Sequence, residues 1–481
     1  MSEEPPEGWT VARLGEVFEV NPRKPSADLL DEHAQVTFIP MAAVDEVAGA
    51  ITNRDTRAYG EVRKGYTAFA EGDVILAKIT PCFENGKVAI ATGLENDLGF
   101  GSSEFHVLRP LGGVIAKYLY HYLRQPGFRE EAANHMTGTA GQERVSVEYV
   151  REHEIPIPPV PEQWRIVEKV EALLTQVSSA RERLGRVPRL LKWFRQAVLA
   201  AACEGRLTEG WREAHRLSDW QSSKLRSVVT LLDQGWSPKC EIEPANSDVA
   251  WGVMKTTAVQ PMRFLPEENK ALPQSLEPRK GLEVRVGDLL ITRAGPRARA
   301  GVSCLVRATR PRLMICDKVY RFRVDDRIVQ PPFVEMYLNT AQMIDVLDSL
   351  KTGISDSGVN LTQEKFLDLE ITLPDRAEQI EIIRRVESLF SLADTIERRV
   401  NGALSRAEKL PQAILSRAFA GELVPTEAES ARAEGRTYET AEELLERIRG
   451  ERDLADRKSP VRMREKDTPR GRLATGRRKP G

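Results

Sequence analysis

Two segments of the chain carry apolar residues at steps that alternate between four and three. The first run extends from Ile166 to Val198 and the second from Ile382 to Ile414. A period of 3.5 residues sustained this long is typical of a coiled-coil seam, whereas an ordinary core helix keeps it for two or three turns. We therefore predict two long helices, with seams that include Ile166, Val170, Leu173, Val177, Leu184, Ile382, Val386, Leu389, Ile396 and Val400.

The two predicted seams differ in the size of their residues. The first contains Leu191 and Phe194, while the second is rich in alanine, as at Ala403. Large residues in one seam and small residues in the other favour pairing of the two helices with each other. Pro188 and Pro411 are expected to kink or interrupt the helices at different points.

Both helical segments belong to an internal repeat. Residues 162–207 align with residues 378–423 at a constant offset of 216, without a gap. Upstream of each copy lies a more diverged module, in which Gly72-Asp73 matches Gly287-Asp288 and Thr137-Gly138 matches Thr352-Gly353. The chain therefore has an internal pseudo-two-fold, which favours an antiparallel helix pair and suits a partner that is gripped at two places.

The two modules have the short apolar runs of β-strands, separated by turns such as Asn85-Gly86. Each also has a helical stretch late in its sequence. We predict an α+β fold: two modules with small sheet cores, joined by two long helical regions that form an antiparallel coiled coil. The predicted segments are a first module (1–158), a first helical region (159–208), a second module (209–374), a second helical region (375–425) and a tail (426–481).

Bulk properties are those of a soluble protein with several domains. The chain has 481 residues, 41% apolar and 29% charged, with a net charge of −1, so any nucleic-acid surface must be local. No apolar run approaches membrane-spanning length and the first residues do not resemble a signal peptide. Five cysteines without CxxC spacing indicate free thiols rather than a metal site or disulfides, so we expect a cytoplasmic protein without a membrane partner.

The strongest local charge lies in the second module, where residues 291–312 contain six arginines and no acid. Lys78 of the first module aligns with Arg293, and polar loops at 137–144 and 352–360 also correspond. Basic side chains in loops suit contacts to phosphates and guanine edges, although a solvated hairpin is the alternative. The candidate DNA-binding residues are Lys78, Thr80, Asn85, Lys87, Thr137, Arg144, Thr292, Arg293, Arg297, Arg299, Thr352 and Ser355.

Catalytic motifs are not evident. Gln330-Pro331-Pro332-Phe333 resembles the (Asn/Asp)-Pro-Pro-(Tyr/Phe) motif of amino-methyltransferases, but glutamine replaces the amine acceptor and no glycine-rich cofactor loop lies upstream. Asn85-Gly86-Lys87 lacks the first glycine of a phosphate-binding loop, and the six histidines are scattered. We therefore expect a binding protein with no catalytic residues, no metal site and no cofactor of its own.

These features together resemble the specificity subunit of type I restriction-modification enzymes, up to about residue 455. The segments that carry the resemblance are Gly8-Trp9, Leu14–Val17, Ile155–Gln163, Arg195–Thr208, Leu373-Pro374, Glu378-Gln379, Gln412–Val424 and Ala441–Arg449. In the second module Asp219-Trp220 stands where the first has Gly8-Trp9, which is a small departure.

The resemblance implies a non-catalytic subunit of which each module is a target recognition domain, reading one half of a bipartite, asymmetric site in double-stranded DNA. The helices would set the spacer and dock two methyltransferase (modification) subunits that use S-adenosylmethionine. Two restriction subunits that use ATP and magnesium would complete the assembly. Three alternatives remain open: a scaffold without DNA binding, a fused methyltransferase and an orphan subunit without restriction. The basic tail from Arg457 is expected to be disordered and could contact DNA nonspecifically.

Overall fold

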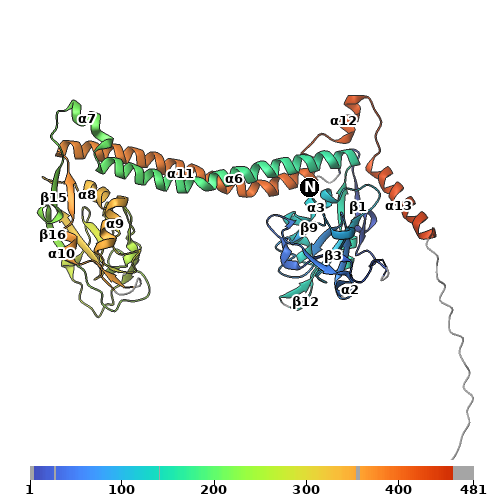
Figure 1. Ribbon diagram of the computed structural model, residues 1–481, viewed down its shortest axis with the longest axis horizontal. Helices are drawn as coiled ribbons and strands as arrows, with labels where there is room; N and C mark the ends of the chain where they lie inside the picture. Colours follow the sequence, from blue (N-terminus) through green and yellow to red (C-terminus); the bar gives the residue numbers. More distant parts are fainter. Residues whose placement is uncertain (1–4, 27–28, 140, 354–357, 459–481) are drawn as a thin grey trace, which may run out of the picture. The chain divides into compact units, whose positions relative to one another are not determined.

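The computed structural model describes residues 5–26, 29–139, 141–353 and 358–458, which form two compact units (Figure 1). Unit 1 combines residues up to 181 with residues from 405 onward, and unit 2 comprises residues 182–404. Each unit therefore contains one module and part of both helical regions. The boundaries of the two units fall inside the two helical regions. The five segments proposed from the sequence therefore stay a prediction. Among the described residues, no helix is long and apolar enough to cross a lipid bilayer.

Unit 1 is built around two four-stranded sheets. Its strands are β1 (Thr10–Arg13), β2 (Phe18–Val20), β3 (Gln35–Ile39), β4 (Val44–Asp45), β5 (Ala50–Ile51), β6 (Asp55–Ala58), β7 (Thr67–Ala70), β8 (Val74–Ala77), β9 (Val88–Ile90), β10 (Leu98–Gly101), β11 (Phe105–Pro110), β12 (Thr137–Thr139), β13 (Gln142–Arg144) and β14 (Glu154–Ile157). The sheet β2-β11-β8-β9 is antiparallel throughout, whereas β6-β3-β10-β7 contains the parallel pair β3/β10. The antiparallel pairs β1/β14, β4/β5 and β12/β13 complete the strands.

Unit 2 repeats the main sheet of unit 1. Its strands are β15 (Gln221–Lys224), β16 (Val229–Gln234), β17 (Gly252–Met254), β18 (Val259–Gln260), β19 (Arg263–Phe264), β20 (Asn269–Ala271), β21 (Leu289–Thr292), β22 (Ala294–Gly295), β23 (Ser303–Leu305), β24 (Leu313–Met314), β25 (Val319–Val324), β26 (Val359–Asn360) and β27 (Glu370–Leu373). The antiparallel sheet β16-β25-β21-β23 has the strand order of β2-β11-β8-β9, and β15/β27 matches β1/β14. The second sheet is the three-stranded β20-β17-β24.

Short helices cover the sheets at matching places in the two units. In unit 1 they are α1 (Leu14–Val17), α2 (Tyr59–Val62), α3 (Ala116–Leu123), α4 (Pro126–Ala133) and α5 (Val147–Glu152). In unit 2 they are α7 (Glu209–Ala214), α8 (Pro331–Leu338), α9 (Ala341–Leu350) and α10 (Gln363–Leu367). Helix α3 corresponds to α8, and the proline that begins α8 suits a first turn because it has no N–H to leave unpaired. The predicted strands and late helices are thus confirmed.

The repeated Gly-Asp pairs stabilise the main sheets. Gly72 has a φ of 85°, a conformation that glycine adopts without strain, and it is followed by Asp73, which lies directly before β8 and is 1% exposed. The two carboxylate oxygens of Asp73 accept hydrogen bonds from Nε and Nη2 of Arg109 at 2.9 and 2.8 Å. In unit 2 the buried Asp288 accepts from Nε of Arg323 at 2.7 Å. The equivalent arrangement explains why this dipeptide recurs in otherwise diverged modules.

The two long helices, α6 (Val160–Cys203) and α11 (Arg376–Phe419), have 44 residues each. In unit 1 the start of α6 and the end of α11 share a buried cluster, to which Val170 and Ala418 contribute. In unit 2 the end of α6 and the start of α11 do the same, with Val198 and Ile382. The pairing is therefore antiparallel, and the predicted fold of two modules with a coiled coil is confirmed.

Two details of the helices differ from the sequence-based expectation. Both Pro188 and Pro411 lie inside continuous helices, so neither interrupts its helix, and the alternative of a kink stays a prediction. Helix pairing on both sides of each proline offsets the single backbone hydrogen bond that proline removes. Among the ten predicted seam residues, nine are buried or partly buried, whereas Ile396 is 37% exposed.

The repeated glutamate at the start of each long helix joins distant parts of a unit. In unit 1 the buried carboxylate of Glu162 accepts from the indole Nε1 of Trp9 at 2.8 Å and from the backbone N–H of Glu427 at 2.7 Å. In unit 2 the buried Glu378 accepts from Nε1 of Trp220 at 3.0 Å. Each glutamate thereby joins the tryptophan near the start of its module to the long helix that follows the module.

The neighbouring glutamine connects the same helix to the module's covering helix. In unit 1, Oε1 of Gln163 accepts from the backbone N–H of Ile115 at 3.0 Å, while its Nε2 donates to the carbonyl of Pro158 at 2.9 Å. In unit 2, Oε1 of Gln379 accepts from the N–H of Gln330 at 2.8 Å. Both glutamines are fully buried, so their hydrogen bonds avoid a large desolvation cost.

Unit 1 also contains two helices without full counterparts in unit 2, α12 (Glu427–Glu434) and α13 (Ala441–Lys458) (Figure 1). Helix α13 lies beside α1, where the backbone N–H of Ala441 donates to the carbonyl of Gly8 at 3.0 Å. Arg449 pairs with Glu16 at 2.9 Å, and Ile448 packs closely on Gly112. The predicted tail therefore folds as far as residue 458, and the rest of its basic segment lies outside the described residues.

Candidate nucleic-acid interface

In unit 1 the residue that follows β8 is a hub for three chain segments. The backbone N–H of Lys78 donates to the carbonyl of Glu104 at 2.9 Å, and its own carbonyl accepts from Val145 at 2.9 Å. The guanidinium of Arg144 donates to both carboxylate oxygens of Glu104 at 2.9 Å, and Nζ of Lys78 lies 4.0 Å from the same carboxylate. The hydrogen bond from Arg144, followed by the charge of Lys78, lowers the pKa of Glu104. The group is thus two cations around one anion.

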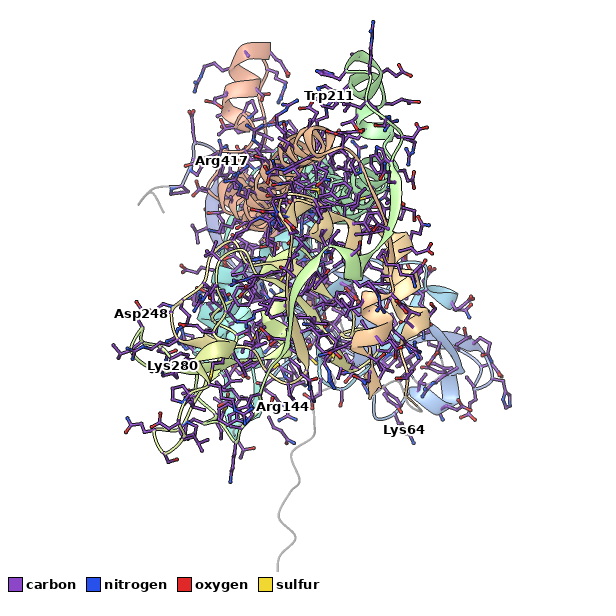
Figure 2. The ribbon with its side chains drawn as sticks, turned by 90° about the vertical axis from the view of Figure 1, so that its left-hand side faces the viewer. Lys64, Arg144, Trp211, Asp248, Lys280 and Arg417 are labelled. Atoms are coloured by element: carbon purple, nitrogen blue, oxygen red, sulfur yellow. The ribbon has the colours of Figure 1, made fainter. Side chains whose placement is uncertain are left out.

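This group lies at the end of unit 1 that is remote from the long helices. Figure 1 shows the β12–β13 hairpin at the opposite end of the unit from α6, and Figure 2 shows Arg144 and Lys64 far from Arg417 of α11. Thr80 fixes the hairpin, since its backbone N–H donates to the carbonyl of Glu143 at 3.0 Å. An extended ligand lying across this end would contact Arg144 before any residue of the helices.

The other predicted DNA-binding residues of unit 1 include both exposed and largely buried side chains. Thr137 is exposed on β12, opposite Arg144 in the strand register. Asn85 is exposed in the turn before β9. Lys87 is different, because its side chain is 14% exposed and its Nζ lies 3.4 Å from a carboxylate oxygen of Glu46. The structure therefore gives Lys87 a role in joining two loops, and a DNA contact there would require that pair to open.

In unit 2 the arginine-rich run is mostly engaged with the protein itself. Arg297 pairs with Asp348 at 3.0 Å, and hydrogen bonds from Lys351 and then from Arg297 lower the pKa of Asp348. Four further guanidiniums donate to backbone or buried acceptors: Arg299 to the carbonyls of Thr256 and Val259, Arg307 to the buried Glu335, Arg310 to the carbonyl of Ala250, and Arg312 to the carbonyl of Val249.

These contacts give most of the run a structural role within unit 2, while its contact with DNA stays a prediction. Arg299 closes a loop by hydrogen bonds to its carbonyls at 2.6 and 2.7 Å. Thr292 is fully buried, and its hydroxyl donates to the carbonyl of Arg299 while its Oγ1 accepts from the N–H of Val302 at 3.0 Å. These two residues shape the loop rather than present a polar group to a ligand.

Arg293 retains the position expected of a DNA contact. Its backbone N–H donates to the carbonyl of Lys318 at 2.8 Å and its carbonyl accepts from Leu361 at 2.7 Å, which reproduces the bonds of Lys78 in unit 1. Its guanidinium lies over the ring of Tyr320, 5.4 Å from the centroid, and its buried Nε has no hydrogen-bond partner among the residues that the structure describes. Lys318 is exposed beside it. The sequence reading missed Lys318, because only the strand pairing places it next to Arg293.

The second polar loop of unit 2 is described in part. Thr352 is exposed, and it pairs with Asn360 through two backbone hydrogen bonds of 2.8 and 2.7 Å. This matches the pairing of Thr137 with Arg144 in unit 1. Ser355 lies outside the described residues. Residues 358–360 lead back to β22, so the loop borders the backbone that carries Arg293.

Comparison with known proteins agrees with the resemblance found in the sequence. The family model for the type I restriction modification DNA specificity domain matches residues 6–187. The specificity subunit of the type I restriction enzyme EcoEI from Escherichia coli is 32% identical, over 86% of this chain and 83% of that one. The chain belongs to the type I restriction enzyme specificity subunits. The StySPI specificity subunit from Salmonella potsdam is also 32% identical, over 74% of this chain and 76% of its own.

A solved structure of another specificity subunit has the same fold. The HsdS subunit from Thermoanaerobacter tengcongensis superposes with a TM-score of 0.64 at 20% identity, covering 88% of this chain and 99% of that one. The resemblance noted in the sequence is thereby confirmed. In this specificity subunit the residues that the structure brings together are Lys78, Thr80, Thr137 and Arg144 in unit 1, and Arg293 with Thr352 in unit 2.

No group of three histidine, cysteine, aspartate or glutamate side chains in the described part of this specificity subunit could hold a metal ion. All five cysteines are free thiols, and burial raises the pKa of Cys316 to about 11. Such a thiol stays protonated at neutral pH and is a poor nucleophile.

Proposed function

We propose that this chain recognises double-stranded DNA through its two modules, each reading one half of a bipartite, asymmetric site. Support comes from the two equivalent backbone frames, in which strand β8 or β21 leads to a basic residue beside a polar hairpin. The side chains on these frames differ: Lys78, Glu104 and Arg144 in unit 1 stand where unit 2 has Arg293, Lys318 and Asn360. A repeated frame with unlike side chains suits two unlike half-sites, since base edges are distinguished by their donors and acceptors.

In this proposal the long helices set the unread spacer and dock two modification subunits. Those subunits would bring S-adenosylmethionine and the methyl-transfer chemistry, while two restriction subunits would bring ATP and magnesium. The chain itself would supply sequence recognition and no catalytic residue. Membership of the specificity-subunit family supports this division of labour.

The decisive experiment maps methylation directed by the chain. The full chain is expressed with its modification subunit in a host that lacks DNA methylation, and modified bases are located by long-read sequencing. We expect one motif of two short defined parts separated by an unread spacer. The purified chain alone, given S-adenosylmethionine and the same DNA, should incorporate no methyl group.

Variants assign the halves of the motif. Arg293→Ala with Lys318→Ala should relax one half and leave the other intact, because both residues belong to unit 2. Arg327→Ala is the matched control, since Arg327 is an exposed arginine of the same unit that pairs with Asp325. Methylation without any sequence preference would reject the proposal in favour of a scaffold, as would a double variant that changes both halves equally.

A further inference from the structure

In unit 2 the residues that follow β16 lie beside the segment that leads into β25. The backbone N–H of Trp236 donates to the carbonyl of Ile315 at 3.1 Å. On the other side of the same segment, the backbone N–H of Arg293 donates to the carbonyl of Lys318 at 2.8 Å. The order β16-β25-β21 of the main sheet thus places Trp236 and Arg293 on either side of the start of β25, at one end of the sheet.

On each side of this segment an arginine lies over an aromatic ring. The guanidinium of Arg279 lies over Trp236, 4.4 Å from the ring centroid, and that of Arg293 lies over Tyr320. Tyr320 and its neighbour Val319 belong to different buried clusters, because successive strand residues point to opposite faces of a sheet. Trp236 packs against the cluster that contains Val319. The two arginines are therefore stacked on opposite faces of the same sheet end.

The hydrogen-bond donors of Arg279 are not used within the described protein. Its side chain is exposed, and its guanidinium has no hydrogen bond or ion pair with any residue that the structure describes. Arg299 and Arg310 are different, since their guanidiniums donate to backbone carbonyls. Stacking on an indole ring fixes the plane of a guanidinium and leaves its five N–H donors available to a ligand.

Arg279 lies at the end of unit 2 that is remote from the long helices. Figure 2 shows Lys280, the next residue in the chain, far from Trp211 of α7, the short helix that follows α6. No sequence motif marks Arg279, which precedes the arginine-rich run of residues 291–312. Its place beside that run depends on the packing of Trp236 against the start of β25.

We propose that Arg279 recognises a guanine in the half-site read by unit 2, and that Trp236 positions its guanidinium. The guanidinium donates two hydrogen bonds, to O6 and N7 of the base in the major groove. Guanine has two adjacent acceptors at this edge, whereas adenine has one acceptor and one donor. A phosphate can be approached from many directions and does not require a fixed plane, so the stacked geometry favours a base. The assignment rests on the proposed function and adds a specificity-determining residue to it.

Methylation mapping with the full chain and its modification subunit tests the assignment. Arg279→Lys keeps the charge and loses the fork of donors. We expect this variant to accept several bases at one guanine position of the motif and to leave the other positions unchanged. On duplexes that carry each base at this position, the native complex should prefer guanine by about tenfold or more, and the variant by less than about threefold. Lys280→Ala is the matched control, because it removes an exposed charge from the adjacent residue and should leave the motif unchanged.

Variants of Trp236 separate positioning of Arg279 from a purely structural role. Trp236→Leu removes the ring beneath the guanidinium and should lower the preference for guanine at the same motif position as Arg279→Lys. Trp236→Phe keeps an aromatic ring and should retain most of that preference. A structural defect alone would not relax one chosen position of the motif.

The outcomes distinguish this assignment from the proposed function on which it rests. A native bipartite motif that Arg279→Lys leaves unchanged would overturn the assignment and leave the proposed function intact. A loss of affinity that is equal for all sequences would make Arg279 a phosphate contact and would also overturn the assignment. A native chain that directs methylation without any motif would reject both.

Discussion

The two modules of this specificity subunit share a backbone frame and differ in the charges placed upon it. In unit 1 an acid, Glu104, lies between Lys78 and Arg144 and neutralises part of their charge. In unit 2 the equivalent position holds Lys318, which places a second cation beside Arg293 where unit 1 has an acid. The shared frame therefore determines where a ligand can be contacted, while a few substitutions determine the charge that the ligand meets there.

The units also differ where the long helices end. In unit 1 the ring of Phe419 packs against Tyr118 and Tyr122, with centroids 5.0 and 5.2 Å apart. At the offset of the repeat its counterpart in unit 2 is Cys203, which lines a cavity of about 970 Å³ together with Tyr337. Unit 1 is therefore filled by an aromatic side chain at a place where unit 2 is hollow.

The largest expected effect comes from making unit 1 resemble unit 2 at this point. Phe419→Cys removes a ring that is almost fully buried among aromatic neighbours, which should lower the free energy of unfolding of unit 1 by about 3 kcal/mol. Hydrogen exchange followed by mass spectrometry would resolve the units. Equal loss of protection in both units would show that they unfold as one.

At pH 5, acid should lower the free energy of unfolding of unit 1 by about 2 kcal/mol more than that of unit 2. Burial lowers the pKa of His121 from its ordinary 6.5 to about 4, so its folding contribution is present above pH 6.5 and is lost as the pH falls toward 4. Burial also lowers the pKa of His106 and of His153 in unit 1, while unit 2 has only the exposed His215.

A single variant isolates the contribution of His121. Met336 occupies the equivalent place in unit 2, so His121→Met should retain the packing and reduce the acid sensitivity of unit 1. Thermal unfolding between pH 7 and pH 5 is the measurement. If unit 2 loses stability first, burial of neutral histidines is not what governs the acid response.

Exchange of the charge beside the basic residue should alter DNA binding by about tenfold, or about 1.4 kcal/mol. Lys318→Glu gives unit 2 the acid of unit 1 and should weaken binding and reduce the salt slope by about one, while Glu104→Lys should do the reverse. Fluorescence anisotropy over a salt series, on the complex with the modification subunit, measures both. An unchanged slope in both variants would remove these positions from the interface.

The smallest effect is expected from filling the cavity of unit 2. Cys203→Phe restores the ring that unit 1 has and should raise the stability of unit 2 by at most about 1 kcal/mol, because the cavity opens to water. The paired comparison is Phe419→Cys in the same unfolding assay. A loss of stability would show that the cavity walls cannot accept the ring.

The helices and most strands could be predicted because their signals are local. The seam spacing of residues 166–198 and the apolar run at 289–291 depend on near neighbours in the sequence. The Glu-Gln pairs also stood out through repetition, but only the fold supplies their partners, such as Trp9 for Glu162.

The DNA-contacting residues were harder to predict, since a guanidinium looks the same whether it faces solvent or a carbonyl. The sequence pattern predicts that Arg310 is exposed to solvent, yet its guanidinium donates to the carbonyls of Ala245 and Ala250, about sixty residues earlier in the chain. Conversely, Lys318 has no motif of its own and gains its place from strand pairing with Arg293. Such contacts between distant segments leave no periodic trace in the sequence.

The division of the chain into units bears on how the protein is made. Unit 2 is one continuous stretch of chain, so all of its parts are present when residue 404 has left the ribosome. Folding of unit 1 cannot be completed at that stage, because the carboxylate of Glu162 accepts a hydrogen bond from the backbone N–H of Glu427 and because α13 packs beside α1. During synthesis the first module therefore stays incomplete until the later helices arrive, and a chain that stops early would offer one finished module instead of two.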